Sequence, residues 1–233
     1  MVQVNSLNVL ELVKKLEKGK PFTFVRYGDG EWRCILGYGG KNCDGHQYMP
    51  ELKLALEEAV CSDDGVIWGM QRKAVKDLNV ALMDYLAVNK IDRAWYDSDC
   101  LHKANIKGRL WPFVKALKTK RVLVVGPMHL GTSSLEFEQL IDVPKVDCFK
   151  KVDGVFKRVL DACKWCEVIL FSSSMMTNVL QHRLWPLIGD KITMIDCGSM
   201  WDGYAGFKSR GMFRDPNMDW DKLKLVNMFG EQG

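Results

Sequence analysis

The sequence predicts an α/β fold: a Rossmann-like, mostly parallel sheet with helices on both faces. Short, continuous apolar runs such as RVLVV at 121–125 and EVILF at 167–171 are typical of strands that are buried on both sides. Helical patterns separate these runs along the chain, which is the β-loop-α order of a parallel sheet. Right-handed crossovers then place the strand-to-helix loops together at one edge of the sheet, where ligands bind in such folds.

The first half of the chain begins with a helix. Residues 6–19 carry apolar side chains at near-helical spacing, and FTFVR at 22–26 predicts a strand because aromatic and β-branched residues fill it. A glycine-punctuated turn follows, with the first turns of a helix expected at 31–37. The glycine-rich stretch 38–50 predicts a loop over the site. The later elements expected in this half are a helix from Pro50 to Val60, a strand at 66–69, a helix at 73–88 and a polar loop at 92–110 that leads into a helix ending at Leu117.

The second half repeats the same alternation of strands and helices. The apolar runs predict three strands, at 121–125, 167–171 and 192–195, and a fourth, shorter one at 146–149. Helical patterns are expected at 132–141, 152–164, 175–187 and, after a polar and irregular stretch, 219–228.

Composition defines the class of protein and leaves its partners open. Hydrophobic residues make up 47% and charged residues 27% of the 233, which excludes a disordered or collagen-like chain. We expect one domain over 1–206 and a C-terminal extension over 207–233 packed on it. The net charge of +4 is too small to identify a nucleic-acid partner. No signal-peptide pattern or membrane-length apolar run is found, so we expect a cytoplasmic protein without a membrane span; whether it forms a homo-oligomer is left open.

The first strand-to-helix loop carries two carboxylates. Asp29 and Glu31 flank Gly30 directly after the strand that ends at Arg26, and Gly28 permits a tight turn. Two carboxylates at this spacing can bind one hard cation such as Mg²⁺ or Mn²⁺ on a diphosphate, and an arginine beside them can hold a phosphate or pair with the acids. In the alternative interpretation, the loop is an Asx-type turn and Glu31 only stabilises a helix N-terminus.

Two later loops offer hydrogen-bond donors to a nucleotide. Gly126, Pro127 and His129 belong to a strand-to-helix turn whose backbone N–H groups can bind an anion, although helix capping by neighbouring hydroxyls explains the same pattern. His129 itself can be a base or a phosphate ligand, or only a residue of the turn. Ser172, Ser173 and Ser174 follow the strand EVILF. They can cap the next helix and contact a nucleotide. No GxSxG motif surrounds them, which disfavours a hydrolase nucleophile.

Three acids or imidazoles are candidates for a catalytic base. Asp196 ends the last strand, Asp202 follows it, and His46 lies in the glycine-rich loop that would cover the site. The alternative for Asp196 is that it caps the turn after its own strand. The sequence alone does not rank the three.

The order of these segments resembles the GT-D glycosyltransferase family. The resemblance rests on FVRYGDGEW at 24–32, HQYMPELKLALEEAV at 46–60, VLVVGP at 122–127, VILFSSS at 168–174 and MIDCGSMWDGY at 194–204. It implies a Rossmann-like fold, a nucleotide-sugar donor such as UDP-glucose and a divalent metal, often Mn²⁺, on the D-x-E motif at Asp29 and Glu31. The chain departs from the family where serines replace glycine and proline at 172–174 and where Ser199 replaces histidine.

The expected function is therefore a metal-dependent transfer of a sugar from a nucleotide-sugar donor, with a UDP-sugar favoured, to an acceptor hydroxyl on a glycan or glycoprotein. One alternative is a phage-type DNA glycosyltransferase that acts on hydroxymethylated bases. A second is a non-catalytic nucleotide-binding protein. A methyltransferase is disfavoured because the first loop has no GxGxG and is acidic on both sides of Gly30.

Overall fold

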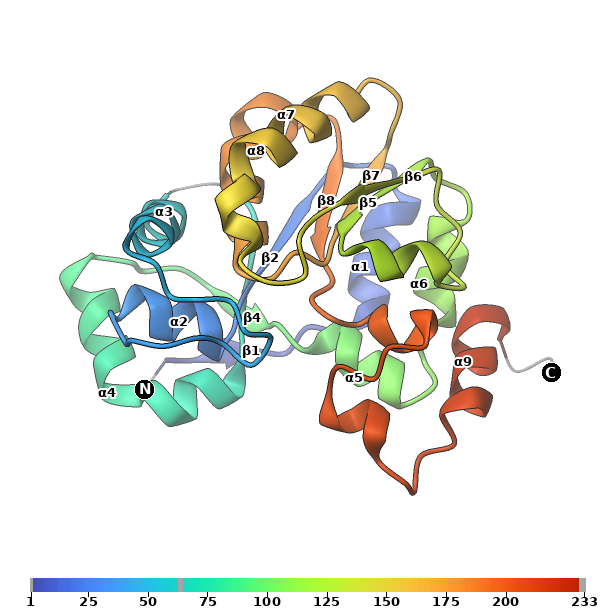
Figure 1. Cartoon of the computed structure of the whole chain (residues 1–233), viewed down its shortest axis with the longest axis horizontal. Coiled ribbons are helices and arrows are strands. Elements are labelled where there is room, and N and C mark those ends of the chain that lie inside the picture. The colour runs from blue at the N-terminus through green and yellow to red at the C-terminus, as the bar shows by residue number, and fades with distance from the viewer. Residues whose placement is uncertain (1, 63–64, 231–233) are drawn as a thin grey trace.

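Eight parallel strands form one sheet in the computed structural model, which describes residues 2–62 and 65–230. The strand order is β1-β4-β3-β2-β8-β7-β5-β6 (Figure 1). The strands are β1 (Val4–Asn5), β2 (Thr23–Tyr27), β3 (Ile67–Met70), β4 (Trp95–Asp97), β5 (Val122–Gly126), β6 (Gln139–Asp142), β7 (Val168–Phe171) and β8 (Thr193–Asp196). This confirms the predicted fold class. The last three residues of the predicted extension, 231–233, lie outside the described residues.

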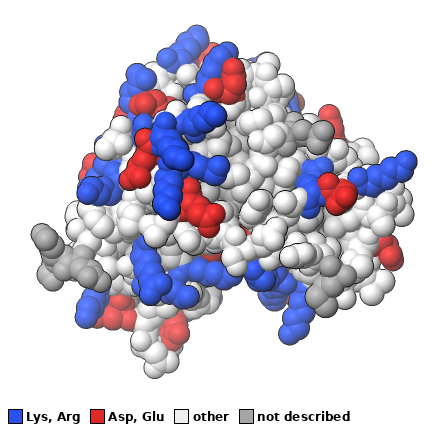
Figure 2. All heavy atoms as spheres, turned by 180° about the vertical axis from the view of Figure 1, so that it is seen from behind, with Lys and Arg blue, Asp and Glu red and all other residues white. Residues whose placement is uncertain are grey.

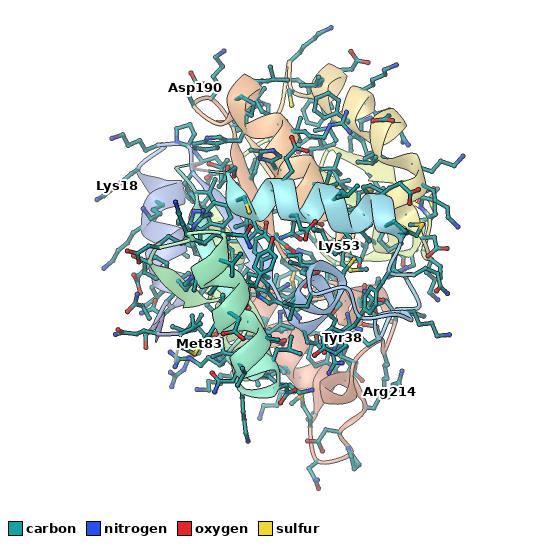
Figure 3. All side chains as sticks on the ribbon, turned by 90° about the vertical axis from the view of Figure 1, so that its left-hand side faces the viewer. Lys18, Tyr38, Lys53, Met83, Asp190 and Arg214 are labelled. Atoms are coloured by element: carbon teal, nitrogen blue, oxygen red, sulfur yellow. The ribbon has the colours of Figure 1, made fainter. Side chains whose placement is uncertain are left out.

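Helices cover both faces of the sheet. On the face turned away from the viewer in Figure 1 lie α1 (Val9–Glu17) and α6 (Trp111–Leu117), against which α5 (Cys100–Ile106) and α9 (Trp220–Phe229) pack. The opposite face carries α2 (Asp29–Ile35), α3 (Pro50–Cys61), α4 (Arg72–Val88), α7 (Val152–Ala162) and α8 (Met176–Ile188). Figure 3 shows α3, with Lys53, and α4, with Met83, lying across this second face.

Alternating strand residues separate the two core layers. In β5, Val122 and Val124 join the cluster under α1 and α6, whereas Leu123 and Val125 join the cluster under α7 and α8. This period of two explains the continuous apolar runs in the sequence, because both faces of each strand are buried. Phe24 of β2 points to the α1 side by the same rule, and Arg26, two residues on, shares its side of the strand.

The sheet opens between β2 and β8, its two central strands. They pair only at Thr23–Met194 and Phe24–Ile195. Where β2 and β8 diverge, two buried side-chain amides of α8 donate hydrogen bonds to β2 carbonyls. Asn178 donates to the Arg26 carbonyl at 2.8 Å, and Gln181 donates to the Phe24 carbonyl at 3.0 Å. The chain leaves β2 toward β3 on one side and reaches β8 from β7 on the other, so this is the crevice where ligands bind in open parallel sheets.

Three sequence-based predictions of local structure were wrong. The stretch 92–110 is not a loop: it holds β4 and α5. Residues 132–141 are not a helix, because 139–142 pair with β5 as the edge strand β6, and tertiary pairing overrides their helical spacing. Residues 146–149 are not a strand, because Asp147 has φ +51° and starts a 3₁₀ turn at Cys148–Lys151. The short edge strand β1 was missed, since two residues carry no periodicity.

Within the described ranges, every helix is too short or too polar to span a bilayer.

Candidate functional site

Arg26 is the centre of a buried group of charges at the carboxyl end of β2. Its Nε donates to the Ser98 carbonyl at 2.8 Å, and its Nη2 lies 3.5 Å from Asp99 Oδ1. Its Nη1 lies 3.7 Å from Asp196 Oδ1, and the side chain is only 16% exposed. Arg26 is therefore an ion-pair partner, but of Asp99 and Asp196 and not of the two acids beside it in the sequence, Asp29 and Glu31.

Gly198 makes room for this arginine. Its φ is +54°, and a Cβ at this position would lie 2.1 Å from Arg26 Nη1. Its N–H donates to Asp196 Oδ1 at 2.8 Å, so the Asx-type capping expected as the alternative role of Asp196 is present. Burial raises the pKa of Asp196 to about 6, although Arg26 and this N–H act in the opposite direction.

Glu31 is a further acid close to Arg26 and Asp196. Its Oε2 accepts the Gly28 N–H at 2.8 Å in the first turn of α2, which is the helix-capping interaction of the alternative interpretation. Burial raises the pKa of Glu31 to about 7, and the nearby Asp196 adds to the rise against the hydrogen bonds and Arg26. We call Arg26, Glu31, Asp99 and Asp196 the Arg26 cluster. It contains more acid than one arginine neutralises.

Asp29 lines a hollow that Glu31 does not line. It helps to line a space of about 290 Å³ beside α2, together with Tyr38 and Asn42 of the loop over the site. Gly30 allows that loop to come close, because a Cβ at Gly30 would lie 3.3 Å from Asn42 Cβ. Among the residues that the structure describes, no group of three or more His, Cys, Asp or Glu side chains surrounds one point as a metal site would. A metal here would have two carboxylates at most from the protein.

A second hollow, of about 260 Å³, opens at the carboxyl ends of β5, β7 and β8. We call it the cleft. Seven of the side chains expected at the site line it: His46, Pro127, His129, Ser172, Ser173, Ser174 and Asp202. The other expected residues lie behind or beside it: Arg26, Gly28, Asp29, Gly30, Glu31, Gly126 and Asp196. Gly126 is buried in β5, where a Cβ would meet Leu130 at 2.6 Å, so its size serves packing.

His129 and Asp202 form a pair in the cleft. His129 Nε2 lies 2.9 Å from Asp202 Oδ1, and the Phe207 ring packs 4.8 Å from the imidazole. The two residues come from short 3₁₀ helices after β5 and β8, Met128–Thr132 and Asp202–Ala205. Since a carboxylate can only accept, the pair places the imidazole proton on Nε2 and leaves Nδ1 as a proton acceptor. The sequence suggested both residues but not their pairing, because 73 positions separate them.

The three serines after β7 play different parts. Ser173 is buried and its hydroxyl is 2.9 Å from Thr177 Oγ1, as in a helix cap. Ser174 has φ +52°, and its hydroxyl accepts a 3.0 Å bond from Asn42, which fastens the loop over the site. Ser172 Oγ is buried without a partner in the described part of the chain. Of the three hydroxyls, Ser172 is the one with an unused hydrogen bond.

His46 is held inside the loop that covers the site. It is buried, and its Nδ1 lies 3.7 Å from Cys148 Sγ. Burial lowers the pKa of His46, and burial raises the pKa of Cys148 to about 12. Both shifts favour the neutral thiol and the neutral imidazole over a thiolate–imidazolium pair.

The cleft also uses residues that sequence reasoning missed. Arg210 forms a two-bonded ion pair with Asp44, 2.7 Å between Nη2 and Oδ2, which ties the chain after residue 206 to the loop over the site. Lys145 Nζ lies 4.0 Å from the centre of the Phe207 ring, and Arg214 is a further basic side chain of the wall. The expected domain boundary at 206 thus runs through the cleft wall. In the sequence, the only feature that pointed to these cleft residues was the polar and irregular character of the chain after residue 206.

A second group, which the predicted site left out, surrounds Arg26. Ser98, Asp99 and His102 follow β4, in the stretch that was expected to be a loop. His102 is buried with its Cε1 close to Gly198, and burial, with Arg26 nearby, lowers its pKa well below the ordinary value. These positions become visible only when β4 is recognised, because β4 aligns them with the end of β2 through β3.

Comparison with known proteins gives the fold. No family model matches the sequence, and no curated protein matches it significantly. Two solved structures are similar, with TM-scores of 0.61 and 0.60, 15% sequence identity, and coverage of 86% of this chain and 80% of theirs. Both are of domain of unknown function 1792, and one is described as having a distinct glycosyltransferase fold. This chain has that glycosyltransferase fold. The resemblance seen in the sequence is thereby confirmed for the fold.

Proposed function

We propose that the chain is a metal-dependent glycosyltransferase that moves a sugar from a nucleoside-diphosphate donor, a UDP-sugar, to an acceptor hydroxyl on a glycan or glycoprotein. One observation carries the proposal: on a glycosyltransferase fold, a basic cleft with a His–Asp pair opens at the carboxyl edge of the sheet, beside two acidic residues of α2.

The charge of the cleft suits a diphosphate. Lys145, Arg210 and Arg214 line it against two acids, Asp44 and Asp202. Arg210 is paired with Asp44, and the three basic side chains exceed the two acids by one, so positive charge remains for phosphate oxygens. These groups would bind the donor and stabilise the charge that develops on the leaving diphosphate.

Asp29 and Glu31, on either side of Gly30 at the start of α2, are the carboxylates that would bind a divalent cation shared with the donor. Mg²⁺-type sites often use one or two protein carboxylates and take their remaining ligands from substrate phosphates and water. Two carboxylates are what this helix start supplies, and the excess of buried acid around Glu31 would be relieved by a cation. When bound, the metal would act as a Lewis acid on the diphosphate.

The His129–Asp202 pair is the proposed base for the acceptor hydroxyl. Asp202 orients the imidazole and supports its charge once Nδ1 has taken the proton. The other two candidates are less suited. Asp196 is engaged with Arg26 and Gly198 behind the cleft, and His46 faces the Cys148 thiol.

A thermal-shift experiment tests the donor site. UDP, GDP, ADP and S-adenosylmethionine are each added with and without Mn²⁺; a ligand at 100 times its dissociation constant adds about 2.7 kcal/mol to the free energy of unfolding. We expect stabilisation by UDP only with Mn²⁺, and its loss in Asp29→Asn and Glu31→Gln. Glutamine keeps a side-chain oxygen for the Gly28 N–H, so the helix cap survives.

Glu51→Gln, which removes a similar charge from the exposed start of α3, is the matched control and should behave as the wild type. Stabilisation by S-adenosylmethionine without metal, or by no diphosphate at all, would reject the proposal. Binding of UDP with Mn²⁺ but no sugar transfer to any glycan would leave the nucleotide-binding alternative in its place.

A further inference from the structure

A large groove lies away from the cleft, between α1, α5, α6 and α9. Its volume is about 670 Å³. Apolar side chains form its floor and one wall, among them Leu7, Val9, Leu10, Ala104 and Val226. Neither the Arg26 cluster nor the His129–Asp202 pair lines it. It is therefore a site without a part in the proposed transfer reaction.

The rim of this groove is basic. Lys103, Lys107 and Arg109 line it, and no Asp or Glu among the described residues does. The whole stretch from Cys100 to Arg121, which forms α5 and α6, has seven Lys or Arg residues and no acid. Figure 2, drawn from behind, shows Lys and Arg side chains spread over the face on which α1 and α6 lie. Lys103 is paired with Asp97, whereas Lys107 and Arg109 form no ion pair with any residue that the structure describes.

Apolar side chains project beside these charges. Leu10 of α1 is 48% exposed, and Phe229 at the end of α9 is 57% exposed. Trp111 lies at the groove with Lys118 Nζ 5.8 Å from its ring centre. Exposed leucine and phenylalanine, an amphipathic tryptophan and surrounding lysines are the combination that binds the interface of a membrane, with the apolar groups among the acyl chains and the cations at the phosphates.

We propose that this face docks onto an anionic lipid surface: an acyl chain enters the groove, and Lys107 and Arg109 contact lipid phosphates. Charge complementarity selects this occupant. A second copy of the chain in a two-fold dimer would bring the same basic residues against each other. A nucleic acid would use the charges but leave the apolar groove and the exposed Leu10 in water.

Helix α5 connects this face to the candidate site. Its Lys103 and Ala104 line the groove, while His102, on the same helix, is buried beside Gly198. Asp99, directly before the helix, is paired with Arg26. Because a helix is about 10 Å across, only the thickness of α5 separates the groove from the residues beside Arg26. A docked lipid surface would hold a membrane-bound acceptor close to the site, but docking itself does not depend on the proposed transfer.

Vesicle flotation tests the proposal with the full chain and no sugar donor. Vesicles of phosphatidylcholine alone are compared with vesicles that also contain phosphatidylglycerol, at low and high salt. We expect binding to the anionic vesicles, release by salt, and little binding to the neutral ones. Lys107→Glu with Arg109→Glu should weaken the binding about 30-fold or more.

Two matched controls separate this face from general charge and apolarity. Lys157→Glu with Lys164→Glu makes the same change of charge on and after α7, at exposed positions on the other side of the sheet, and should leave most of the binding intact. Leu10→Glu should abolish insertion, whereas Leu54→Glu at the exposed position on α3 should cost much less. Circular dichroism verifies that each variant is folded.

Equal binding to neutral and anionic vesicles overturns the proposal, as does an equal loss in both double variants. Undiminished vesicle binding by the Leu10→Glu variant also overturns it, because the groove would then take no part in docking. Tight, salt-sensitive binding to duplex DNA in place of vesicles would assign the basic face to nucleic acid instead. None of these outcomes bears on the Mn²⁺-dependent UDP binding, so the two proposals fail separately.

Discussion

The Arg26 cluster and the cleft lie at the same edge of the sheet, yet they hold their charges differently. Arg26 is nearly surrounded by protein: Ser98, Asp99 and Asp196 use its three nitrogens, and burial raises the pKa values of the acids Glu31 and Asp196. In the cleft, the pairs His129–Asp202 and Arg210–Asp44 face open space. The difference teaches that Arg26, the arginine of the conspicuous sequence motif, is held by protein groups below the site, whereas residues dispersed along the sequence line the open cleft.

The largest expected effect is on turnover, in the cleft. His129→Gln should lower kcat about 100- to 1,000-fold, and Asp202→Asn somewhat less, because the base or its orienting partner is lost. The melting temperature should change little, since His129 is partly exposed. Initial rates with a UDP-sugar, over a range of pH, measure this; the KM for the donor should stay near that of the wild type.

His182→Gln on α8, beside Glu58 and away from the cleft, is the control for loss of an imidazole. If His129→Gln turned over normally while Asp196→Asn did not, the division between floor and ligand-facing residues would be reversed. The base would then belong to the Arg26 cluster.

A smaller effect, on stability, is expected in the Arg26 cluster. Gly198→Ala should lower the free energy of unfolding by about 3 kcal/mol, because the new methyl group meets Arg26 in addition to the strained positive φ. Gly206→Ala also has a positive φ, +76°, but nothing lies within 4 Å of the added atom, so about 1 kcal/mol is expected. Urea denaturation of both measures the difference, which isolates the contact with Arg26. Equal losses in the two variants would mean that the arginine moves aside freely.

The smallest effect concerns Asp97, which borders the cluster at the end of β4. Burial acts to raise its pKa, but hydrogen bonds from Lys103, the Asp99 N–H and Arg72 together lower it below the ordinary 3.8. A lowered folded-state pKa contributes stability above the unfolded pKa, and this is lost as the pH falls through the folded one. Asp97→Asn should therefore cost about 1–2 kcal/mol at neutral pH, and the difference from wild type should shrink in acid.

Denaturant midpoints at neutral and acid pH measure this difference. Asp77→Asn, at an exposed position of α4, is the control and should match the wild type at both. A cost for Asp97→Asn that stays constant with pH would show that the carboxylate charge contributes nothing and only its hydrogen bonds do.

The sequence could predict the elements whose pattern is local. Continuous apolar runs indicated β5, β7 and β8 because strands buried on both faces must be apolar throughout. The D-x-E after β2 and the serines after β7 were placed at one edge by crossover handedness alone. The sequence did not predict the two edge strands, because β6 has helical spacing and β1 has only two residues. Their pairing with β5 and β4 makes them strands.

By itself, the sequence determined the α/β fold and the edge at which its polar loops gather, since burial of both strand faces and right-handed crossovers leave few alternatives. Only the tertiary structure decided which of those loop residues meet. It paired His129 with Asp202 and Arg210 with Asp44, and it turned Arg26 inward between Asp99 and Asp196. The reason is physical: such pairs form between distant positions, and their geometry depends on how far β2 and β8 diverge, which no local pattern encodes.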